Sequence, residues 1–586
     1  MRARAHGRPA RIDLPMVAVL GRRGRMLVAE PLFRPQGARL EVARGDGREG
    51  QLVLVGAGKR GPRVTRALGR PDVARDVVEA LMLDRGLRRA FPRRAETEAL
   101  EVAAEPPRAG PRTDLTALPT FTIDPDDARD FDDAISAERL DADTVRLWVH
   151  IADVTAFVRP GAALDVEALR RGTSTYVPGA VEPMLPERLS NGECSLRPGE
   201  ERLAVTVELD MVGVDARRVA FHRSLVRSDA RLTYGQVDDV FAGRARAESP
   251  WGEPLAAARA VARALRERRQ ERGALEVESL EPAFELDGDG HVLGVRHDAQ
   301  TESHTLVEEL MILANEQVAG HLAERKLPTL YRVHERPDPL AVEAMLAKLE
   351  ALDVPTPATP ERMSPQQAAD AAAEASRLAA AHVRATGRGG AAFGALVLRS
   401  LKQAYYSPRN VGHAGLASAR YCHFTSPIRR YPDVVAHRAL LAGLGLDDAA
   451  PRAHELDEVG IHASAAEREA MRVERDADDV CLAFLLERAV AERVGTGEAP
   501  VWAGEVVGLI SKGWFVRFGA EGFEGFLPVR RVSGWWEPDE HESQLVDVDS
   551  RRAIRLGDPV RVAVERIEAA RGRVDLELVA NGPRRP

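Results

Sequence analysis

The sequence predicts an α+β protein in which a central mixed α/β domain is flanked by small β-barrels. Three observations predict this fold. The 586 residues exceed one ordinary domain. Short apolar runs separated by glycine-rich turns occur near both ends, and the middle mixes strand-like with helix-like segments. The composition, 44% hydrophobic and 29% charged, is typical of a folded globular protein with a substantial core.

Residues 12–70 are predicted to form a small barrel of OB or cold-shock size, because several short strands fall within about 60 residues. Its strand-like runs are Met16–Leu20, Met26–Ala29, Leu40–Ala43 and Leu52–Val55. A helix and a linker are expected over 71–112. The helix spans 71–85, with Pro71 near its start and Gly86 after its end. The stretch from Arg93 to Arg112, rich in Glu, Ala and Pro, is predicted to be a linker.

Residues 113–442 are predicted to form the mixed central domain. Its expected strands are Phe121–Ile123, Val145–Ile151 and Leu203–Leu209, followed by a hairpin at Phe284–Val295 and helices at 302–322 and 364–384. A helical segment is expected over 443–497, and a second OB-sized barrel over 498–580. The strands of that barrel are predicted at Gly504–Leu509, Trp514–Phe518, Gly525–Val529, Val560–Val564 and Val574–Leu578.

Composition also excludes several classes of protein. No run approaches the roughly 20 apolar residues of a membrane helix, and the basic start MRARAHGRPARI lacks the apolar core of a secretory signal. The three cysteines, Cys194, Cys422 and Cys481, are too scattered for a disulfide framework or a zinc ribbon. We therefore expect a cytoplasmic protein. The net charge of −8 argues mildly against nucleic acid, and since only five of 82 basic residues are lysine, any phosphate contact falls to arginine.

The densest chemistry is the segment 122–135, TIDPDDARDFDDAI, which places six aspartates within ten residues. Asp124 ends a predicted strand and Asp132–Asp133 begins another, so the loop between them is expected to bring carboxylates together. All-oxygen ligands select Mg²⁺ or Mn²⁺ over Zn²⁺. An EF-hand is excluded by Arg129 at the glycine position, and a phosphotransferase motif by Ala128. An acidic solvated loop remains the plainer alternative.

A second constellation is the segment 423–433, HFTSPIRRYPD. Its paired arginines and hydroxyls supply many hydrogen-bond donors, which suits a phosphodiester whose charge grows as a P–O bond breaks. The alternative is a salt-bridged loop that holds Asp433. Together with the acidic segment, the arginine loop supplies the two halves of metal-assisted phosphodiester cleavage.

These motifs resemble the RNase II/RNase R family of exoribonucleases, whose catalytic part is the RNB domain. The resemblance extends over 148–161 (WVHIADVTAFVRPG), 171–200, 307–315 (VEELMILAN), 331–337 (YRVHERP) and 423–438. It implies that 113–442 is the RNB catalytic domain, that 12–70 is similar to a cold-shock domain, and that 498–580 is similar to an S1-type RNA-binding domain.

The resemblance also implies roles for individual residues. Asp124, Asp130, Asp132 and Asp133 match the family's four catalytic aspartates, which hold Mg²⁺, with Mn²⁺ a possible substitute. Asp132 is expected to be the most sensitive to substitution. Arg429 matches the arginine at the scissile phosphate, and Arg430 is a further expected RNA contact. Tyr176 matches an aromatic residue that stacks on the last nucleotides.

The predicted activity is processive 3′→5′ hydrolysis of single-stranded RNA to nucleoside 5′-monophosphates by a monomer with no membrane partner. The alternative is a catalytically inactive RNB-fold regulator that only binds RNA; a phosphatase of small substrates is a weaker alternative. The sequence departs from the family in having room for one barrel before the acidic motif, no lysine-rich tail, and Ala414 where relatives often have phenylalanine. We therefore expect a weaker or altered grip on RNA upstream of the catalytic domain.

Overall fold

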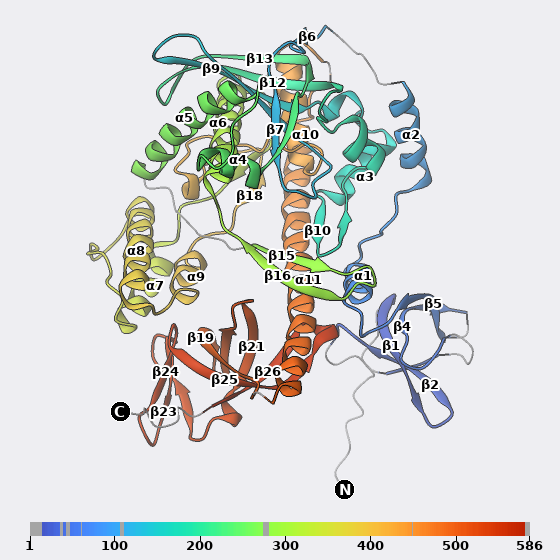
Figure 1. Cartoon of the computed structure of the whole chain (residues 1–586), viewed down its shortest axis with the longest axis vertical. Coiled ribbons are helices and arrows are strands. Elements are labelled where there is room, and N and C mark those ends of the chain that lie inside the picture. Colours follow the sequence, from blue (N-terminus) through green and yellow to red (C-terminus); the bar gives the residue numbers. More distant parts are fainter. Residues whose placement is uncertain are drawn as a thin grey trace.

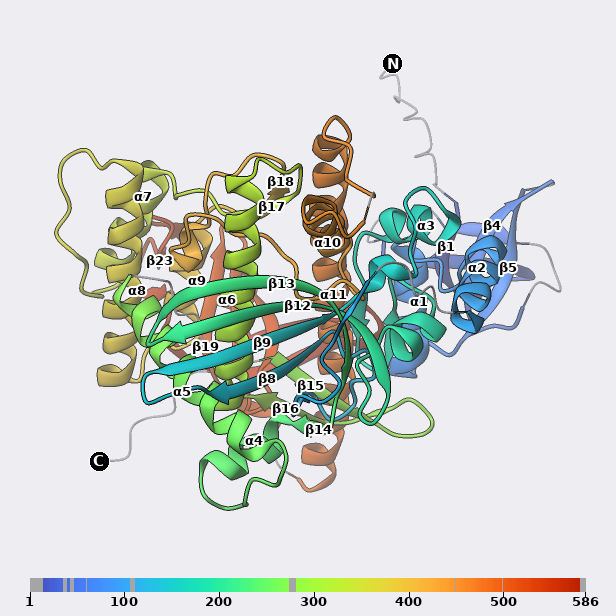
Figure 2. The same cartoon turned by 90° about the horizontal axis from the view of Figure 1, so that it is seen from above.

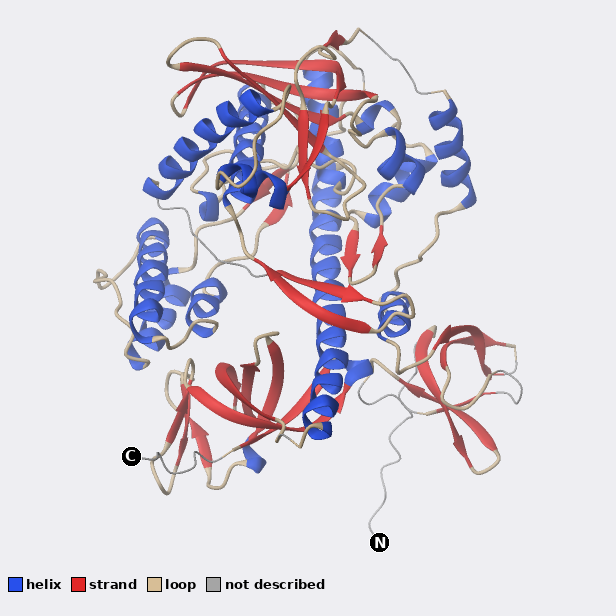
Figure 3. Ribbon diagram, viewed as in Figure 1, coloured by secondary structure: helices blue, strands red, loops and turns tan. Residues whose placement is uncertain are grey.

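The computed structural model describes residues 14–34, 39–42, 47–59, 61–105, 111–272, 281–447, 449–497 and 499–579. The basic start and the Gly582–Pro586 end lie outside the described residues. Strand-rich units form both ends of the chain, and the residues between these units in the sequence form a body of helices packed on a sheet (Figures 1 and 3). The predicted α+β class is confirmed.

The first unit is a curled sheet in which neighbouring strands are antiparallel, with the hydrogen-bonded order β3-β2-β1-β4-β5. Its strands are β1 (Met16–Arg23), β2 (Met26–Pro31), β3 (Leu40–Val42), β4 (Leu52–Gly58) and β5 (Gly61–Gly69). Alternate side chains such as Met16, Ala18 and Leu20 point into its small apolar core. The strands predicted here from apolar runs are therefore confirmed within the described residues, whereas the domain boundaries of 12–70 stay a prediction.

The helix predicted for 71–85 is confirmed as α1 (Ala74–Asp84), which buries Val77, Val78 and Leu81. The linker predicted from Arg93 to Arg112 is wrong for its first half, because α2 (Arg93–Ala104) forms there. Ala95 and Ala99, four residues apart, bury one face of this helix. The Glu98 carboxylate accepts a hydrogen bond from the Leu164 amide (3.0 Å) at the start of the next helix, so tertiary contacts support a segment that looked unstructured.

The central sheet has seven strands in the order β14-β7-β8-β9-β12-β13-β6. Its members are β6 (Thr113–Asp114), β7 (Phe121–Asp124), β8 (Asp133–Arg139), β9 (Thr144–Ala152), β12 (Glu201–Val212), β13 (Asp215–Arg227) and β14 (Ala230–Thr233). The two outer strands run parallel to their neighbours, and the other pairings are antiparallel. Three predicted strands lie within β7, β9 and β12 and are confirmed. Figure 2 shows β8, β9, β12 and β13 side by side.

Helices cover one face of this sheet and shield its largest apolar core. They are α4 (Tyr234–Phe241), α5 (Gly252–Glu271), α6 (Glu302–Glu324) and α10 (Tyr431–Gly443). Beyond the sheet lie α3 (Ala163–Arg171) and the short hairpin of β10 (Thr175–Val177) and β11 (Ala180–Glu182). The hairpin predicted at 284–295 is confirmed as β15 (Glu281–Leu286) and β16 (Val292–Asp298).

A 40-residue helix, α11 (Leu456–Gly495), runs from the central body to the C-terminal barrel (Figure 1). It contacts α1, β10 and the barrel strands β21, β25 and β26, so it joins all three parts of the chain. A separate helical group consists of α7 (Pro339–Ala351), α8 (Pro365–Thr386) and α9 (Ala392–Arg399). The short strands β17 (Tyr331–Val333) and β18 (Tyr405–Ser407), which flank this group in the sequence, pair with each other. The helices expected at 302–322 and 364–384 are confirmed as α6 and α8, and α11 lies within the helical segment expected over 443–497.

The C-terminal unit is a closed barrel in the order β19-β20-β21-β26-β25. Its strands are β19 (Val501–Ile510), β20 (Gly513–Phe518), β21 (Phe523–Pro528), β25 (Pro559–Glu568) and β26 (Arg573–Leu578). The sequence patterns missed the inserted sheet of β22 (Trp536–Pro538), β23 (Gln544–Asp547) and β24 (Ala553–Arg555), because its three- and four-residue strands are too short to show a period.

Candidate active site

The acidic segment forms the connection between β7 and β8 at the end of the central sheet. Phe121 pairs with Ile135, so the strand before the acidic segment and the strand after it are antiparallel neighbours. The Ser195 hydroxyl accepts a hydrogen bond from the Phe131 amide (3.0 Å) and donates one to the Arg129 carbonyl (2.8 Å). The Ala152 amide of β9 donates to the Asp132 carbonyl (2.9 Å). These contacts anchor the backbone on which the predicted carboxylates lie.

Three of the four predicted carboxylates are held in surroundings that disfavour their charge. Burial, together with the charge of Asp130, raises the pKa of Asp124 to about 6. Burial and the charge of Asp124 raise the pKa of Asp133 to about 7. Asp132 is 5% exposed, and its pKa rises well above the ordinary value, mainly through burial. The mutual effects show that these side chains lie close enough to repel one another.

A cation fits this environment. Among the buried side-chain oxygens without a hydrogen-bond partner are Asp124 Oδ2 and Asp132 Oδ2, which are hard acceptors for a metal. Within the described residues, however, no three His, Cys, Asp or Glu side chains gather around one point as a metal site. The expected convergence of several carboxylates on one point is therefore not seen in that form. Mg²⁺ commonly takes one or two protein carboxylates and completes its shell with water and phosphate oxygens, which suits this arrangement.

The arginine loop reaches the acidic segment from a distant part of the chain. The Ile428 amide donates a hydrogen bond to Asp132 Oδ1 (2.8 Å), across 296 positions in the sequence. The Arg429 Nε lies 3.6 Å from Asp132 Oδ2, and 45% of the Arg429 side chain is exposed. The guanidinium opposes the rise in the pKa of Asp132. Tertiary folding thus brings the two predicted catalytic residues together and leaves the arginine accessible.

Arg430 is oriented differently from its neighbour. Its Nε and Nη2 donate to the two oxygens of Asp433 (2.9 and 2.8 Å), and its side chain is 17% exposed. The pKa of Arg430 is raised because the adjacent Asp433 charge outweighs burial. The salt-bridged alternative therefore describes Arg430 but not Arg429. The RNA contact expected of Arg430 stays a prediction, and in the structure this guanidinium is committed to Asp433.

Tyr176, on β10, also faces the acidic segment. Its hydroxyl donates a hydrogen bond to Asp130 Oδ2 (2.9 Å), and the residue is 40% exposed. Its amide donates to Glu474 Oε1 (2.9 Å) of α11. Burial of the hydroxyl and the Asp130 charge raise the pKa of Tyr176, so the phenol stays neutral. The hydroxyl is therefore attached to Asp130, and part of the side chain stays accessible to a ligand.

Sequence reasoning missed two further residues beside the carboxylates. The charge of Arg231, on β14, opposes the rise in the pKa of Asp124. The Arg231 Nη2 also donates a hydrogen bond to the Pro125 carbonyl. Tyr234, at the start of α4, has a pKa raised by burial and by the charges of Asp133 and Asp124, and it stacks on His304 with ring centroids 3.8 Å apart. Neither lies in a segment that is distinctive by composition, and no signal short of the fold identifies them.

All three cysteines, Cys194, Cys422 and Cys481, are free and buried. In the part of the chain that is described, no helix has both the length and the apolar character needed to cross a membrane.

Comparison with known proteins places the site within a known domain. The RNB domain family matches residues 112–445, and the S1 RNA binding domain family matches residues 498–578. The chain is 35% identical to ribonuclease R of Aquifex aeolicus over 88% of its own length and 72% of the relative's. It is 34% identical to ribonuclease R of Escherichia coli over 91% of its own length, but that alignment spans only 66% of the longer protein.

Solved structures show the same fold. Ribonuclease R of Mycoplasma genitalium, in complex with ribose-methylated single-stranded RNA, superposes with a TM-score of 0.84 at 23% identity over 97% of this chain and 90% of the other. Yeast Ssd1, described as a pseudonuclease, superposes with a TM-score of 0.65 at 16% identity over 92% of this chain and 68% of the other. Because active and inactive proteins share this fold, activity has to be argued from the side chains of the site.

Proposed function

The chain belongs to the RNase II/RNase R family of 3′→5′ exoribonucleases, and from that membership we propose that its acidic segment and arginine loop form a working hydrolytic site. The proposed substrate is single-stranded RNA, degraded processively from its 3′ end. The proposed products are nucleoside 5′-monophosphates. One observation carries the proposal: the buried Asp132 carboxylate lies against the half-exposed guanidinium of Arg429. The Ile428 amide, 296 positions from Asp132 in the sequence, fixes the same carboxylate.

The family's hydrolases are metal-dependent, and we propose Mg²⁺, with Mn²⁺ as a substitute, for this chain. Asp124 and Asp132 would hold the ion through the oxygens that accept no hydrogen bond, with Asp130 and Asp133 beside them. A bound divalent ion would lower the pKa of a water molecule and polarise the phosphate. It would also neutralise the carboxylates whose ionised form burial disfavours. This is a physical reason for four acids to lie in one segment.

The chain's own residues account for binding and orientation. The Ile428 amide fixes one oxygen of Asp132, so the other keeps a constant direction. Arg429 presents a permanent positive charge beside it, where the phosphate at the cut would carry increasing negative charge. Tyr176 offers an exposed aromatic face, and stacking on any base is worth about 1–3 kcal/mol regardless of sequence. This arrangement favours processing of RNA without sequence preference.

Further properties follow as proposals from the same family. We propose that the protein acts as a monomer in the cytoplasm and without a membrane partner. The C-terminal barrel would bind RNA outside the site, since its family is an RNA-binding one. The first unit, as a cold-shock domain, would do the same.

The alternative, an inactive RNA-binding regulator, is less well supported. A relative that has lost catalysis is expected to lack one or more of the four aspartates or the arginine. This chain has all five, and the charge of Arg429 acts on both Asp132 and Asp133, which supports the active reading.

The test is incubation of the purified protein with single-stranded RNA labelled at its 5′ end, with and without Mg²⁺. We expect progressive shortening from the 3′ end, release of 5′-monophosphates, arrest by a chelator, and recovery on adding Mg²⁺ or Mn²⁺. The matched variant is Asp132→Asn, which keeps the side chain's shape and is expected to bind RNA without degrading it. Activity in excess chelator, or wild-type turnover by this variant, would contradict the proposal. RNA binding by the wild type without hydrolysis would support the inactive alternative.

A further inference from the structure

Asp433 lies in the first turn of α10 and is completely buried. Its Oδ1 accepts a hydrogen bond from the Ser426 amide (2.8 Å). Both of its oxygens accept from the Arg430 guanidinium. A single carboxylate therefore holds the arginine loop at two points, one before and one after Arg429.

The first of these points is connected directly to the catalytic arginine. The Ser426 hydroxyl accepts a hydrogen bond from Arg429 Nη2 (3.1 Å). The Arg429 carbonyl accepts from the Ser174 amide (2.9 Å) and from the Thr173 hydroxyl (3.1 Å), on the segment that leads to Tyr176. The backbone of Arg429 is thus held from one side and its guanidinium from the other.

These contacts matter because an arginine side chain has many rotamers. Holding one rotamer costs about 2 kcal/mol of side-chain entropy, and an exposed guanidinium is not held by packing. In this loop the Ser426 hydroxyl is a direct acceptor for Arg429, and Asp433 fixes the position of Ser426. The orientation of the Arg429 charge therefore depends on a buried residue that contacts neither Asp132 nor solvent.

We propose that Asp433 is a positioning residue for the RNA hydrolysis assigned above: acting through Ser426, it holds the Arg429 guanidinium at the scissile phosphate. This inference rests on the proposed function, because it concerns the rate of that reaction. Its rival is a purely structural role, in which Asp433 only neutralises Arg430 and stabilises the start of α10. The two roles differ in whether the effect of changing Asp433 depends on Arg429.

A double-mutant cycle separates the two roles. The variants are Asp433→Asn, which keeps the shape but removes the charge, and Ser426→Ala, which removes only the hydroxyl. Each is made alone and with Arg429→Lys, which keeps a positive charge but lacks the fork that reaches Ser426. The matched control is Asp153→Asn, because Asp153 is also completely buried and paired with two arginines, Arg112 (2.7 Å) and Arg223 (2.8 Å).

The measurements are the single-turnover rate of RNA cleavage at saturating enzyme, the Kd for RNA, and the melting temperature. In the presence of Arg429, we expect Asp433→Asn to slow cleavage by up to about 100-fold, the cost of misplacing a catalytic group by about 1 Å. Ser426→Ala is expected to slow it by about 10-fold, in line with loss of one positioning contact. With Arg429→Lys, both losses are expected to shrink to about 2-fold or less, whereas independent sites would give the same loss in both backgrounds. With arginine retained at position 429, the Kd for RNA is expected to stay unchanged in Asp433→Asn and in Ser426→Ala.

Asp153→Asn is expected to lower the melting temperature but to change the rate by the same factor in both backgrounds. The positioning role would be overturned if Asp433→Asn or Ser426→Ala slowed cleavage equally with arginine and with lysine at 429. It would also be overturned if a folded Ser426→Ala variant kept the wild-type rate. Failure of the proposed function is a different result, since the wild type itself would then leave RNA intact.

Discussion

Asp133→Asn is expected to make the metal-free protein more stable while abolishing RNA hydrolysis. Each pKa unit is worth about 1.4 kcal/mol, so a rise from the ordinary 3.8 to about 7 costs the ionised Asp133 about 4 kcal/mol at pH 8. Relaxation around the charge reduces this figure, and we expect a gain of about 2–4 kcal/mol. For a cooperative unit the size of the RNB domain, that corresponds to about 3–6 °C in Tm.

The sign of the pH dependence follows from the same pKa. A carboxyl whose pKa is raised on folding binds more protons in the folded than in the unfolded state between pH 4 and 7. The wild type therefore loses stability as pH rises through that window, and the gain from Asp133→Asn grows over the same range. It is expected to be complete at pH 8 and to disappear as pH falls toward 4.

The assay is thermal unfolding in a chelator at pH 8 and at pH 5, repeated with millimolar Mg²⁺. A bound cation would offset the cost of the Asp133 charge, so the difference at pH 8 should shrink when Mg²⁺ is present. Asp127→Asn is the matched control, since Asp127 lies in the same loop but is exposed. Destabilisation by Asp133→Asn at pH 8, or an equal gain at both pH values, would refute the reasoning.

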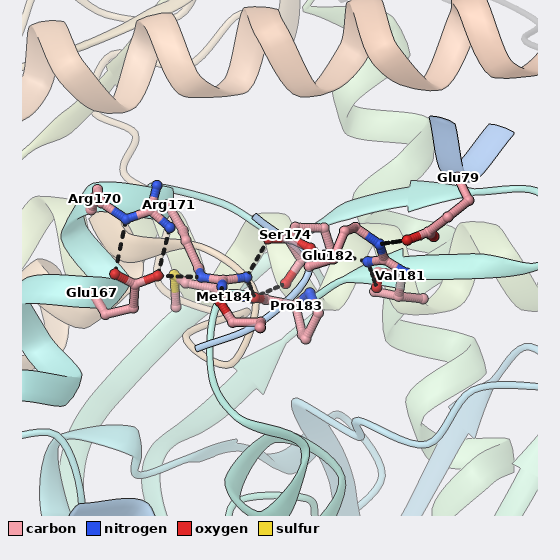
Figure 4. A network of polar contacts seen from close by, with 11 residues as sticks. Glu79, Glu167, Arg170, Arg171, Ser174, Val181, Glu182, Pro183 and Met184 are labelled. Atoms are coloured by element: carbon pink, nitrogen blue, oxygen red, sulfur yellow. Dashed lines mark hydrogen bonds and ion pairs between the residues drawn. The ribbon is translucent and has the colours of Figure 1, made fainter. Parts of the chain in front are cut away.

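Three further predictions concern other parts of the molecule. Tyr176→Phe, which removes the hydroxyl that donates to Asp130, should leave the Kd for RNA unchanged, whereas Tyr176→Ala should weaken binding by about 1–3 kcal/mol for each lost stack in a filter-binding assay. Arg171→Met should destabilise the protein by about 1–3 kcal/mol in denaturant unfolding, because buried Glu167 and Glu182 lose their shared partner and each keeps one other arginine (Figure 4). Glu505→Ala should speed proteolysis at the start of α9, since three amides there (Gly390, Ala391 and Ala392) lose their acceptor on β19.

The Arg171 cluster also illustrates how distant segments are joined. Its guanidinium donates to Glu182 Oε1 (2.6 Å) and to the Pro183 and Ala90 carbonyls (2.9 and 3.0 Å). Arg89 extends the network by donating to Glu182 Oε2 (3.0 Å) and to Glu79 of α1 (2.9 Å). The β10–β11 hairpin that carries Tyr176 is therefore fastened to the segment that follows the first sheet.

Local patterns in the sequence were sufficient for most elements near the site. The strand that ends at Asp124 and the strand that begins at Asp133 follow from apolar residues flanking an acidic loop, and the structure places both as predicted. The prediction of a linker was wrong for Arg93–Ala104, because α2 is supported by partners far along the chain, such as Leu164. Helical propensity in that segment was visible, but the tertiary contact was not.

For the candidate site as well, the local sequence decided some features and the tertiary structure decided others. The sequence by itself determined which groups are available: four aspartates in one loop, an arginine pair after a proline, and an aromatic residue in a third motif. Only the tertiary structure decided their roles. Arg429 turns toward Asp132 while Arg430 turns inward to Asp433, although the two are adjacent and chemically identical. The physical reason is that the partner of Arg430 lies three residues away on the same loop. The direction of Arg429 depends instead on Asp132, in a distant segment that no local spacing records.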